Sequence, residues 1–131
     1  MKTEIKREYL SSYDDVSREE HFLNDQLHRE EGPALIFYYD NGQIMEEHYY
    51  RNGQSYRENG PTDIYYYQNG QKECENYCLE NGKLHRENGP ATIRYYDNGK
   101  IKSKKYFIKG YEITDTVQLM VIQGLENKLI Q

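Results

Sequence analysis

The sequence predicts an all-β repeat protein, an elongated antiparallel β-meander that ends in a capping α-helix at the C-terminus. A motif of the form Leu-His-Arg-Glu-Glu-Gly-Pro-Ala-x-Ile-x-Tyr-Tyr-Asp-Asn-Gly at residues 27–42 returns twice in related form, and its Gly-Pro pairs begin at Gly32, Gly60 and Gly89, 28 and 29 residues apart. Asn-Gly dipeptides separate strand-like runs within this period, at 41–42, 52–53, 69–70, 81–82 and 98–99. A period of this length is typical of a supersecondary unit that buries its apolar face only by stacking on its neighbours.

The composition fits one thin domain. The chain has 131 residues, a formal net charge of −5 and 30% charged residues, and its mean hydropathy is −1.10. Such polarity is typical of disorder unless aromatic residues lie in register. Fifteen tyrosines and three phenylalanines, without tryptophan, supply rings with polar tips that suit a partly hydrated sheet. We expect a single repeat domain over residues 1–131, with a degenerate half-repeat at 9–27, repeats at 28–55, 56–84 and 85–111, and an amphipathic helix at 114–130.

The half-repeat is expected to form the first strands. Its tripeptide at 20–22 matches that at 47–49, with Glu-His before an aromatic residue, and Asn24-Asp25 stands where Asn-Gly is expected. In the full repeats each Asn-Gly predicts a type I′ hairpin turn, because both central residues of that turn need a positive φ. The Gly-Pro corner predicts a second, wider turn, after which proline opens the next strand.

Aligned positions that repeat in all units mark the buried face. They alternate at period two, so they share one face of the sheet. They are Ala34, Thr62 and Ala91, then Ile36, Ile64 and Ile93, then Tyr38, Tyr66 and Tyr95.

The opposite face varies between units, and variation on a repeated scaffold indicates a recognition surface. The alternative is that these positions are merely solvated. Tyrosine and arginine dominate interface hot spots, which favours a protein partner over a small molecule. The predicted partner-binding residues are Phe37, Tyr39, Tyr65, Tyr67, Arg94 and Tyr96.

The His-Arg-Glu motif favours a structural role. Its histidines, His28 and His85, are replaced in the middle unit by Tyr56, which cannot supply a general base or the usual metal ligand. The neighbouring arginines and glutamates are expected to form charge-assisted hydrogen bonds that hold the corner. His21 and His48 precede aromatic residues, and nothing pairs them with a carboxylate and a nucleophile in a repeatable geometry. We predict no catalytic site, metal or cofactor, and therefore no enzymatic activity.

Cys74 and Cys78 fall within one apparent strand, about 13 Å apart at ~3.3 Å per residue, beyond disulfide reach. We expect reduced thiols in a reducing compartment. The absence of a signal peptide and of a long apolar run predicts a cytoplasmic protein.

The C-terminal pattern changes after Gly110. Thr114-Asp115-Thr116 followed by spaced apolar residues predicts an N-capped amphipathic helix that covers the last sheet edge. The alternative is a homodimer, formed through this helix or through a sheet edge.

Residues 100–109 carry five lysines and no acidic residue. Among them, Lys102, Lys104 and Lys105 are candidate contacts for an anion or a lipid headgroup, and the alternative is a solvated rim. The acidic balance of the whole chain disfavours a nucleic-acid partner.

The motif Leu-His-Arg-x-x-Gly-Pro-Ala-x-Ile-x-Tyr-Tyr-x-Asn-Gly resembles the variant form of MORN repeats, over about residues 20–111. Such repeats occur in antitoxin-like bacterial proteins and in giant DNA viruses and their virophages. The resemblance implies β-hairpin stacks without enzymatic activity that act in protein contacts or at membranes. We therefore expect a non-catalytic protein-protein interaction scaffold, located in host cytoplasm if viral. A peripheral binder of anionic membrane lipids and an antitoxin-like partner of a toxin are the alternatives.

Overall fold

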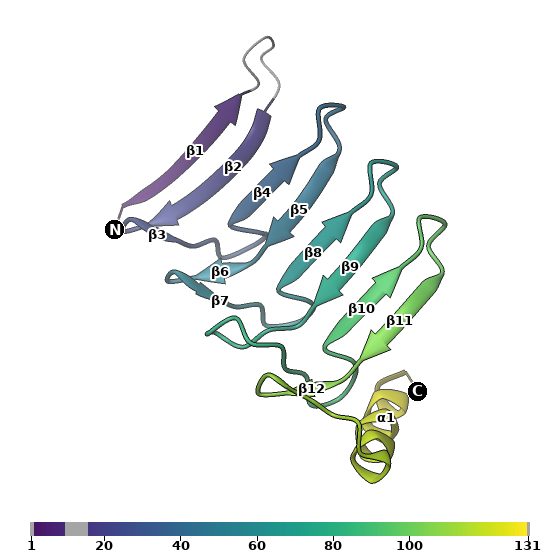
Figure 1. The fold of residues 1–131 in the computed structure, drawn as a ribbon. Coiled ribbons are helices and arrows are strands. Elements are labelled where there is room, and N and C mark those ends of the chain that lie inside the picture. The colour runs from purple at the N-terminus through teal and green to yellow at the C-terminus, as the bar shows by residue number, and fades with distance from the viewer. Residues whose placement is uncertain (1, 10–15, 131) are drawn as a thin grey trace.

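The computed structural model describes residues 2–9 and 16–130, which form an open antiparallel β-sheet followed by one C-terminal helix (Figure 1). The main strands are β1 (Thr3–Tyr9), β2 (Val16–Leu23), β4 (Leu35–Tyr38), β5 (Ile44–His48), β8 (Asp63–Tyr66), β9 (Lys72–Asn76), β10 (Thr92–Tyr95) and β11 (Ile101–Lys105). They lie in the order β1-β2-β4-β5-β8-β9-β10-β11, and each neighbouring pair is antiparallel. The predicted antiparallel β-structure with a C-terminal helix is therefore confirmed.

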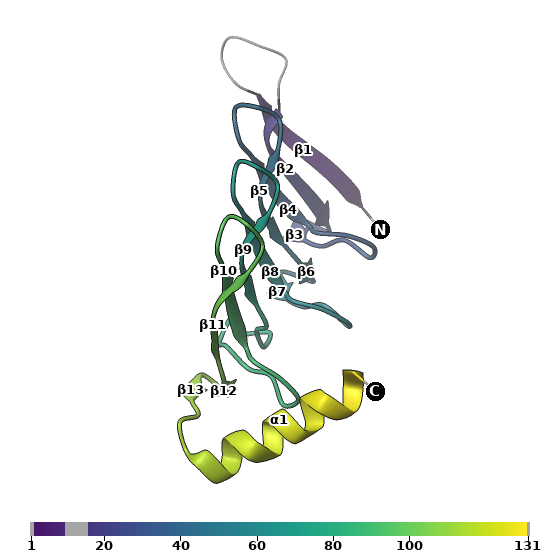
Figure 2. The same ribbon diagram turned by 90° about the vertical axis from the view of Figure 1, so that its right-hand side faces the viewer.

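Short strands lie beside the main sheet, below its long hairpins (Figures 1 and 2). β3 (Gln26–Leu27) pairs with β2, β6 (Tyr50–Arg51) with β7 (Gln54–Ser55), and β12 (Phe107–Ile108) with β13 (Tyr111–Glu112). Two consecutive residues with positive φ connect each pair, as in type I′ turns. These residues are Asn24 and Asp25, Asn52 and Gly53, and Lys109 and Gly110.

The long hairpins, and the short loop between Cys78 and Leu84, use a different turn from the one predicted. In the Asn-Gly pairs at 41–42, 69–70, 81–82 and 98–99, only the glycine has a positive φ. In the first of them the Gly42 amide donates to the Tyr39 carbonyl, and Asn41 Oδ1 accepts the amide of Gln43 at 3.0 Å. Because the asparagine side chain caps a wider loop, the expectation of a type I′ turn at these four dipeptides is wrong.

The core follows the predicted repeating positions in part. Ala34, Ile36, Thr62, Ile64 and Ala91 are at most 6% exposed. The other predicted core positions are only half-buried: Tyr38, Tyr66, Ile93 and Tyr95. The sheet register also reveals a pattern that the sequence analysis missed, in which each isoleucine lies opposite a charged residue of the neighbouring strand. Across the sheet this inner row runs Glu19, Ile36, Glu47, Ile64, Glu75, Ile93 and Lys104.

The N-terminal hairpin β1–β2 was predicted only in part. β1 pairs with β2 from Thr3 to Tyr9, and Arg7 Nε lies 2.8 Å from Glu19 Oε1. The predicted half-repeat at 9–27 omitted β1 because its charged sequence has no clear strand pattern. Residues 10–15 of that half-repeat lie outside the described residues.

Helix α1 (Thr116–Ile130) begins after Asp115, whose Oδ1 accepts the amide of Gln118 at 2.9 Å. It lies beyond the C-terminal end of β11 (Figure 1) and touches the sheet through Glu126, which is 3.6 Å from Lys104 Nζ. Ile122 is buried, whereas Ile101 at the other end of β11 is 51% exposed. The predicted cap therefore reaches only one end of the edge strand.

Four further apolar positions of α1 are exposed: Val117, Met120, Val121 and Leu125. In the part of the chain that the structure describes, no helix is both long and apolar enough to cross a bilayer.

Candidate functional site

The face opposite the core carries an in-register row of the varying residues. Phe37 pairs with Glu46, Glu46 with Tyr65, Tyr65 with Cys74, and Cys74 with Arg94. We call these five residues the outer row. Three of the predicted partner-binding residues, Phe37, Tyr65 and Arg94, thus share one face, and Arg94 is exposed.

His48 organises the aromatic part of this face. Its ring contacts Phe37 and Tyr65 edge-on, with centroid distances of 6.2 and 5.6 Å. Its Nδ1 lies 2.6 Å from Asp63 Oδ1, and its Nε2 lies 3.7 Å from Glu46 Oε1. The sequence analysis did not identify these carboxylate partners, which lie on β8 and within β5 itself.

His21 also has a carboxylate partner that the sequence analysis did not identify. Its Nε2 lies 2.8 Å from Glu19 Oε2, two residues earlier in β2. Glu19 also accepts a hydrogen bond from Arg7. Burial raises the pKa of Glu19, but the bonds to His21 and Arg7 outweigh it, so that the pKa of Glu19 is lowered overall.

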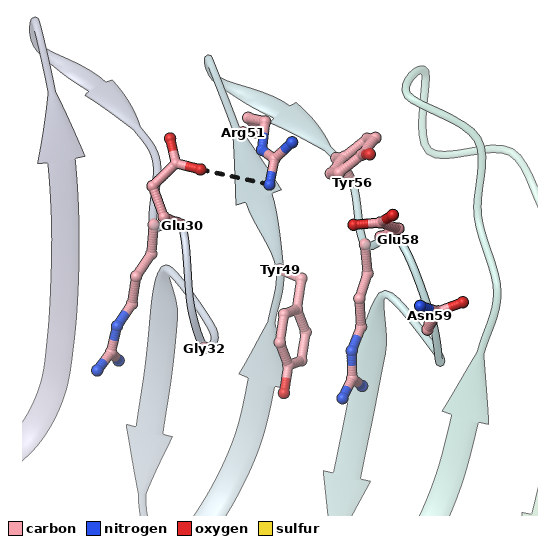
Figure 3. A pocket seen from close by; sticks show the side chains of 9 residues that line it. Glu30, Gly32, Tyr49, Arg51, Tyr56, Glu58 and Asn59 are labelled. Atoms are coloured by element: carbon pink, nitrogen blue, oxygen red, sulfur yellow. Dashed lines mark ion pairs between the residues drawn. The ribbon is translucent and has the colours of Figure 1, made fainter.

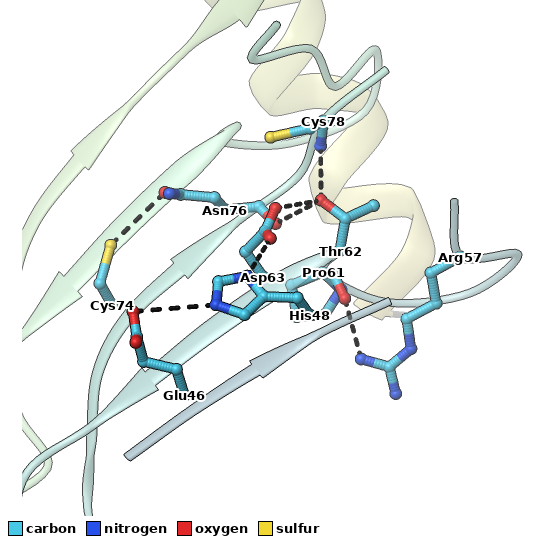
Figure 4. Close-up of polar contacts among 9 residues, drawn as sticks. All are labelled: Glu46, His48, Arg57, Pro61, Thr62, Asp63, Cys74, Asn76 and Cys78. Atoms are coloured by element: carbon cyan, nitrogen blue, oxygen red, sulfur yellow. Dashed lines mark hydrogen bonds and ion pairs between the residues drawn. The ribbon is translucent and has the colours of Figure 1, made fainter. Parts of the chain in front are cut away.

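A polar network extends from Asp63 toward the cysteines (Figure 4). Thr62 Oγ1 donates to Asp63 Oδ2 at 2.9 Å and accepts the amide of Cys78 at 3.1 Å. Burial raises the pKa of the Cys78 thiol to about 11, so it stays protonated at neutral pH. The His48–Asp63 pair therefore has no activated thiol beside it, which favours a positioning role for this network.

The two cysteines are free, as expected. Cys74 lies in β9, but Cys78 lies beyond the end of that strand and forms an isolated bridge with Leu84. The prediction that one strand contains both residues is wrong, because β9 ends at Asn76.

The other predicted contact residues, Tyr39, Tyr67 and Tyr96, lie outside the strands, next to the hairpin turns. The Tyr39 hydroxyl donates to the carbonyl of Tyr66, and the Tyr67 hydroxyl donates to the carbonyl of Tyr95 at 2.7 Å. Tyr39 and Tyr67 thus fasten one hairpin to the next. Tyr96, in the last hairpin, is 50% exposed.

The candidate lipid-contact lysines do not share one face. Lys104 lies opposite Ile93, in the inner row, whereas Lys105 lies opposite Thr92 on the other face. Lys102 Nζ lies 5.9 Å from the ring centre of Tyr96. A flat anionic surface would therefore meet only part of this charge.

The Gly-Pro corners are held by the predicted arginines, but not through the predicted glutamates. Arg29, Arg57 and Arg86 donate to the carbonyls of Pro33, Pro61 and Pro90, at 3.2, 3.0 and 3.2 Å. The guanidinium carbons of Arg57 and Arg86 also stack over Tyr49 and Tyr77, at 4.0 and 3.9 Å. Carbonyl and aromatic contacts replace the expected Arg-Glu bonds because each arginine turns back over its own corner.

The histidines of the corner motif have structural contacts. His28 Nδ1 accepts the amide of Asn52 at 3.0 Å, and His85 Nδ1 accepts that of Lys109 at 2.9 Å. His28 Nε2 lies 2.7 Å from Glu30, and Glu30 lies 3.4 Å from Arg51. The hydrogen bond from His28 and the charge of Arg51 lower the pKa of the Glu30 carboxyl.

A groove of about 290 Å³ lies between the first two corners (Figure 3). Tyr49 lies between the two corners, and Glu30, Arg51 and Glu58 lie at the other end of the groove. Over residues 2–9 and 16–130, no group of three or more His, Cys, Asp or Glu side chains is placed to hold a metal ion.

Comparisons with protein-family models, with curated proteins and with solved structures found no match for the chain.

Proposed function

We propose that the protein is a non-catalytic protein-protein interaction scaffold built from MORN-like repeats, which recognises its partner through the outer row. The observation that carries this proposal is the in-register placement of Phe37, Tyr65 and Arg94 on the face opposite the core. These residue types differ from hairpin to hairpin, whereas the core positions are alike.

Two physical arguments support this use of the row. Aromatic and arginine side chains carry a large share of the binding free energy in protein interfaces. Phe37 and Tyr65 are also held against His48 in the free protein. Because these rings are already ordered, binding costs less side-chain entropy.

Two titratable groups of this face favour recognition over nucleophilic catalysis. Burial keeps the nearby Cys78 thiol protonated at neutral pH. Burial raises the pKa of Tyr65 to about 12, so its hydroxyl stays neutral and available as a hydrogen-bond donor.

Site-specific photo-crosslinking tests the proposal. A photo-reactive phenylalanine derivative replaces Arg94, and the same derivative replaces Tyr111, which is 76% exposed but belongs to the β12–β13 hairpin. A host protein crosslinked from position 94 but not from position 111 is then purified and titrated directly. The identity of that protein also tests the antitoxin-like alternative, which requires a toxin.

The titration uses Tyr65→Ser and Arg94→Ala, with Tyr111→Ser as the matched control. We expect each outer-row variant to weaken binding about tenfold, which corresponds to about 1.4 kcal/mol, and the control to bind like wild type. Equal affinity of all variants for the purified partner would contradict recognition through the outer row.

A further inference from the structure

The last hairpin, β10–β11, carries hydrogen-bond donors at positions that, in the earlier hairpins, donate to the hairpin that follows. The Tyr39 hydroxyl donates to the Tyr66 carbonyl, and the Tyr67 hydroxyl donates to the Tyr95 carbonyl. Tyr96 holds the same place in the last hairpin, where β11 ends the sheet and Tyr96 is half exposed.

A backbone donor follows the same pattern. The Tyr49 amide donates to the carbonyl of Thr62, and the Tyr77 amide donates to that of Ala91, both at 2.8 Å. Each bond runs from the end of one hairpin to the start of the next. Tyr106 is the corresponding residue directly after β11.

A side-chain amide is the third such donor. Asn41 Nδ2 donates to the carbonyl of Gln68 at 3.4 Å, and Asn69 Nδ2 donates to that of Asp97 at 2.9 Å. Asn98 is their exposed counterpart. The edge of β11 therefore carries a repeated set of donors directed toward a strand that residues 2–9 and 16–130 do not supply.

The spacing of the known acceptors defines what fits there. The acceptors of the amide and of the tyrosine hydroxyl are four residues apart, Thr62 and Tyr66 in one case and Ala91 and Tyr95 in the other. Carbonyls separated by an even number of residues point to the same side of an extended strand. One extended segment can therefore satisfy both donors.

The positive charge of β11 favours a segment with acidic side chains. β11 contains Lys102, Lys104 and Lys105 and no acidic residue, whereas the interior strand β5 contains two glutamates and no lysine or arginine. Lys104 and Lys105 point to opposite faces of the sheet. Acidic side chains of an added strand would meet Lys105 on one face, whereas Lys104 on the other face already lies 3.6 Å from Glu126 of α1.

We propose that the free edge of β11 binds an extended acidic segment of a partner protein, which adds to the sheet as an antiparallel strand. Its carbonyls accept hydrogen bonds from the Tyr106 amide and the Tyr96 hydroxyl. Helix α1 contacts the C-terminal end of this edge, where Glu126 lies 3.6 Å from Lys104 Nζ and accepts a hydrogen bond from the Tyr106 hydroxyl at 3.4 Å. It leaves the N-terminal end of β11 open, where Ile101 is half exposed. This edge is a different surface from the outer row, and the proposal does not rest on the use of that row.

Edge lysines also discourage pairing between sheets. A neutral strand would have to bury the ammonium groups, which costs desolvation free energy, and a basic strand would be repelled by them. An acidic strand is the class for which the same lysines favour pairing, by electrostatic complementarity. Protection of the edge and selection of an acidic partner are therefore compatible. Protection alone predicts that no peptide binds, whereas selection predicts that an acidic peptide binds.

The test uses two short fluorescent peptides, one of alternating valine and glutamate and one of alternating valine and lysine. Fluorescence anisotropy with the full chain is expected to show binding of the acidic peptide only. Lys105→Glu should weaken that binding at least fivefold, whereas Lys128→Glu, the same charge change in α1, should leave it unchanged. Tyr96→Phe, which keeps every charge, should weaken it severalfold, and Arg94→Ala should have no effect.

Hydrogen exchange then locates the added strand. We expect the acidic peptide to slow amide exchange at residues 101–106 in particular. Equal binding of both peptides, or no loss with Lys105→Glu, would overturn the proposal. So would retention of the chain on phosphatidylserine vesicles without peptide binding, which indicates a membrane surface, or self-association abolished by Lys105→Glu, which indicates a second copy.

Discussion

At the scale of single residues, the inner row combines carboxylates with phenols. Glu47 accepts a hydrogen bond from Tyr66, and Glu75, which is buried, accepts one from Tyr95. Burial and these bonds raise the pKa of both tyrosines. The pairs explain how a sheet one layer thick tolerates carboxylates between its isoleucines, since buried polar groups are stable only with partners.

Removal of one phenol hydroxyl tests this account. We expect Tyr66→Phe to lower the free energy of unfolding by about 1–3 kcal/mol, because the Glu47 carboxylate loses its partner at a half-buried position. Tyr111→Phe, at an exposed position, should change it by less than about 0.5 kcal/mol. Urea unfolding measures both, and equal stability of the two variants would contradict a supporting role for the Tyr66 bond.

The lowered pKa of Glu19 gives a prediction for acid. A carboxyl whose pKa is lower in the folded than in the unfolded state stabilises the fold above the unfolded pKa, and this contribution is lost as the pH falls through the folded pKa. The contribution of Glu19 is therefore present at neutral pH, begins to decrease below the ordinary glutamate pKa of 4.5, and is lost as the pH falls through the lowered pKa. Glu19→Gln should make the stability less dependent on pH in that acidic range. An unchanged pH profile would show that the bonds to Arg7 and His21 do not persist in solution.

At the scale of elements, the two kinds of turn make different demands on asparagine. Asn52 has a φ of 51°, whereas Asn81 is not among the residues with positive φ and caps the amide of Lys83 at 3.0 Å. The same dipeptide therefore serves two backbone conformations. The local sequence does not separate them, because the difference depends on the loop length between paired strands.

Two substitutions at Asn52 test the type of turn at this position. Asn52→Ala should destabilise the protein by about 1–2 kcal/mol, because alanine is disfavoured at positive φ. Asn52→Gly should be tolerated, since glycine adopts that conformation readily. Thermal unfolding of the two variants makes the comparison, and equal melting temperatures would be inconsistent with a type I′ turn at this position.

Helix α1 contains an internal glycine that packing does not require. A Cβ at Gly124 would meet no atom within 4 Å. Gly124→Ala should therefore stabilise the helix by up to about 1 kcal/mol. Slower amide exchange across residues 117–129 is the expected result, with the exchange of β4 and β8 amides as an internal control. Faster exchange in the helix would mean that the glycine relieves a contact.

At the scale of the whole molecule, the structure could be predicted best where the sequence motif recurs. Ala34, Ile36, Ile64 and Ala91 were identified as core because matched positions at period two have one structural cause. The placement of Phe37, Tyr65 and Arg94 on the opposite face follows from the same periodicity. The sequence also predicted the C-terminal helix, through its cap at Asp115.

The parts that were missed depend on contacts between strands. The partnership of His48 with Asp63 spans 15 residues and joins different hairpins. The alternation of glutamate and isoleucine in the inner row becomes visible only when the register is known. Strand β1 is defined by its pairing with β2, since its own sequence has too few apolar residues to indicate a strand.

The assignment of faces has a direct test. Ile64 is 5% exposed and lies between Glu47 and Glu75, so Ile64→Asp would place another carboxylate directly between two carboxylates of the inner row. We expect it to lower the free energy of unfolding by at least about 3 kcal/mol. Arg94→Ala, at the exposed position of the outer row, should cost less than about 0.5 kcal/mol. Urea unfolding that gives similar losses for both would mean that the two faces have been exchanged.

The fastening of each hairpin to the next by a tyrosine hydroxyl also sets the reach of the molecule. The bonds of Tyr39 and Tyr67 need only the backbone carbonyl of the following hairpin, whatever its side chains are. Duplication of residues 56–84 would therefore lengthen the stack without altering an existing junction. The distance between the N-terminal hairpin and α1 would then increase by a fixed step with each added hairpin.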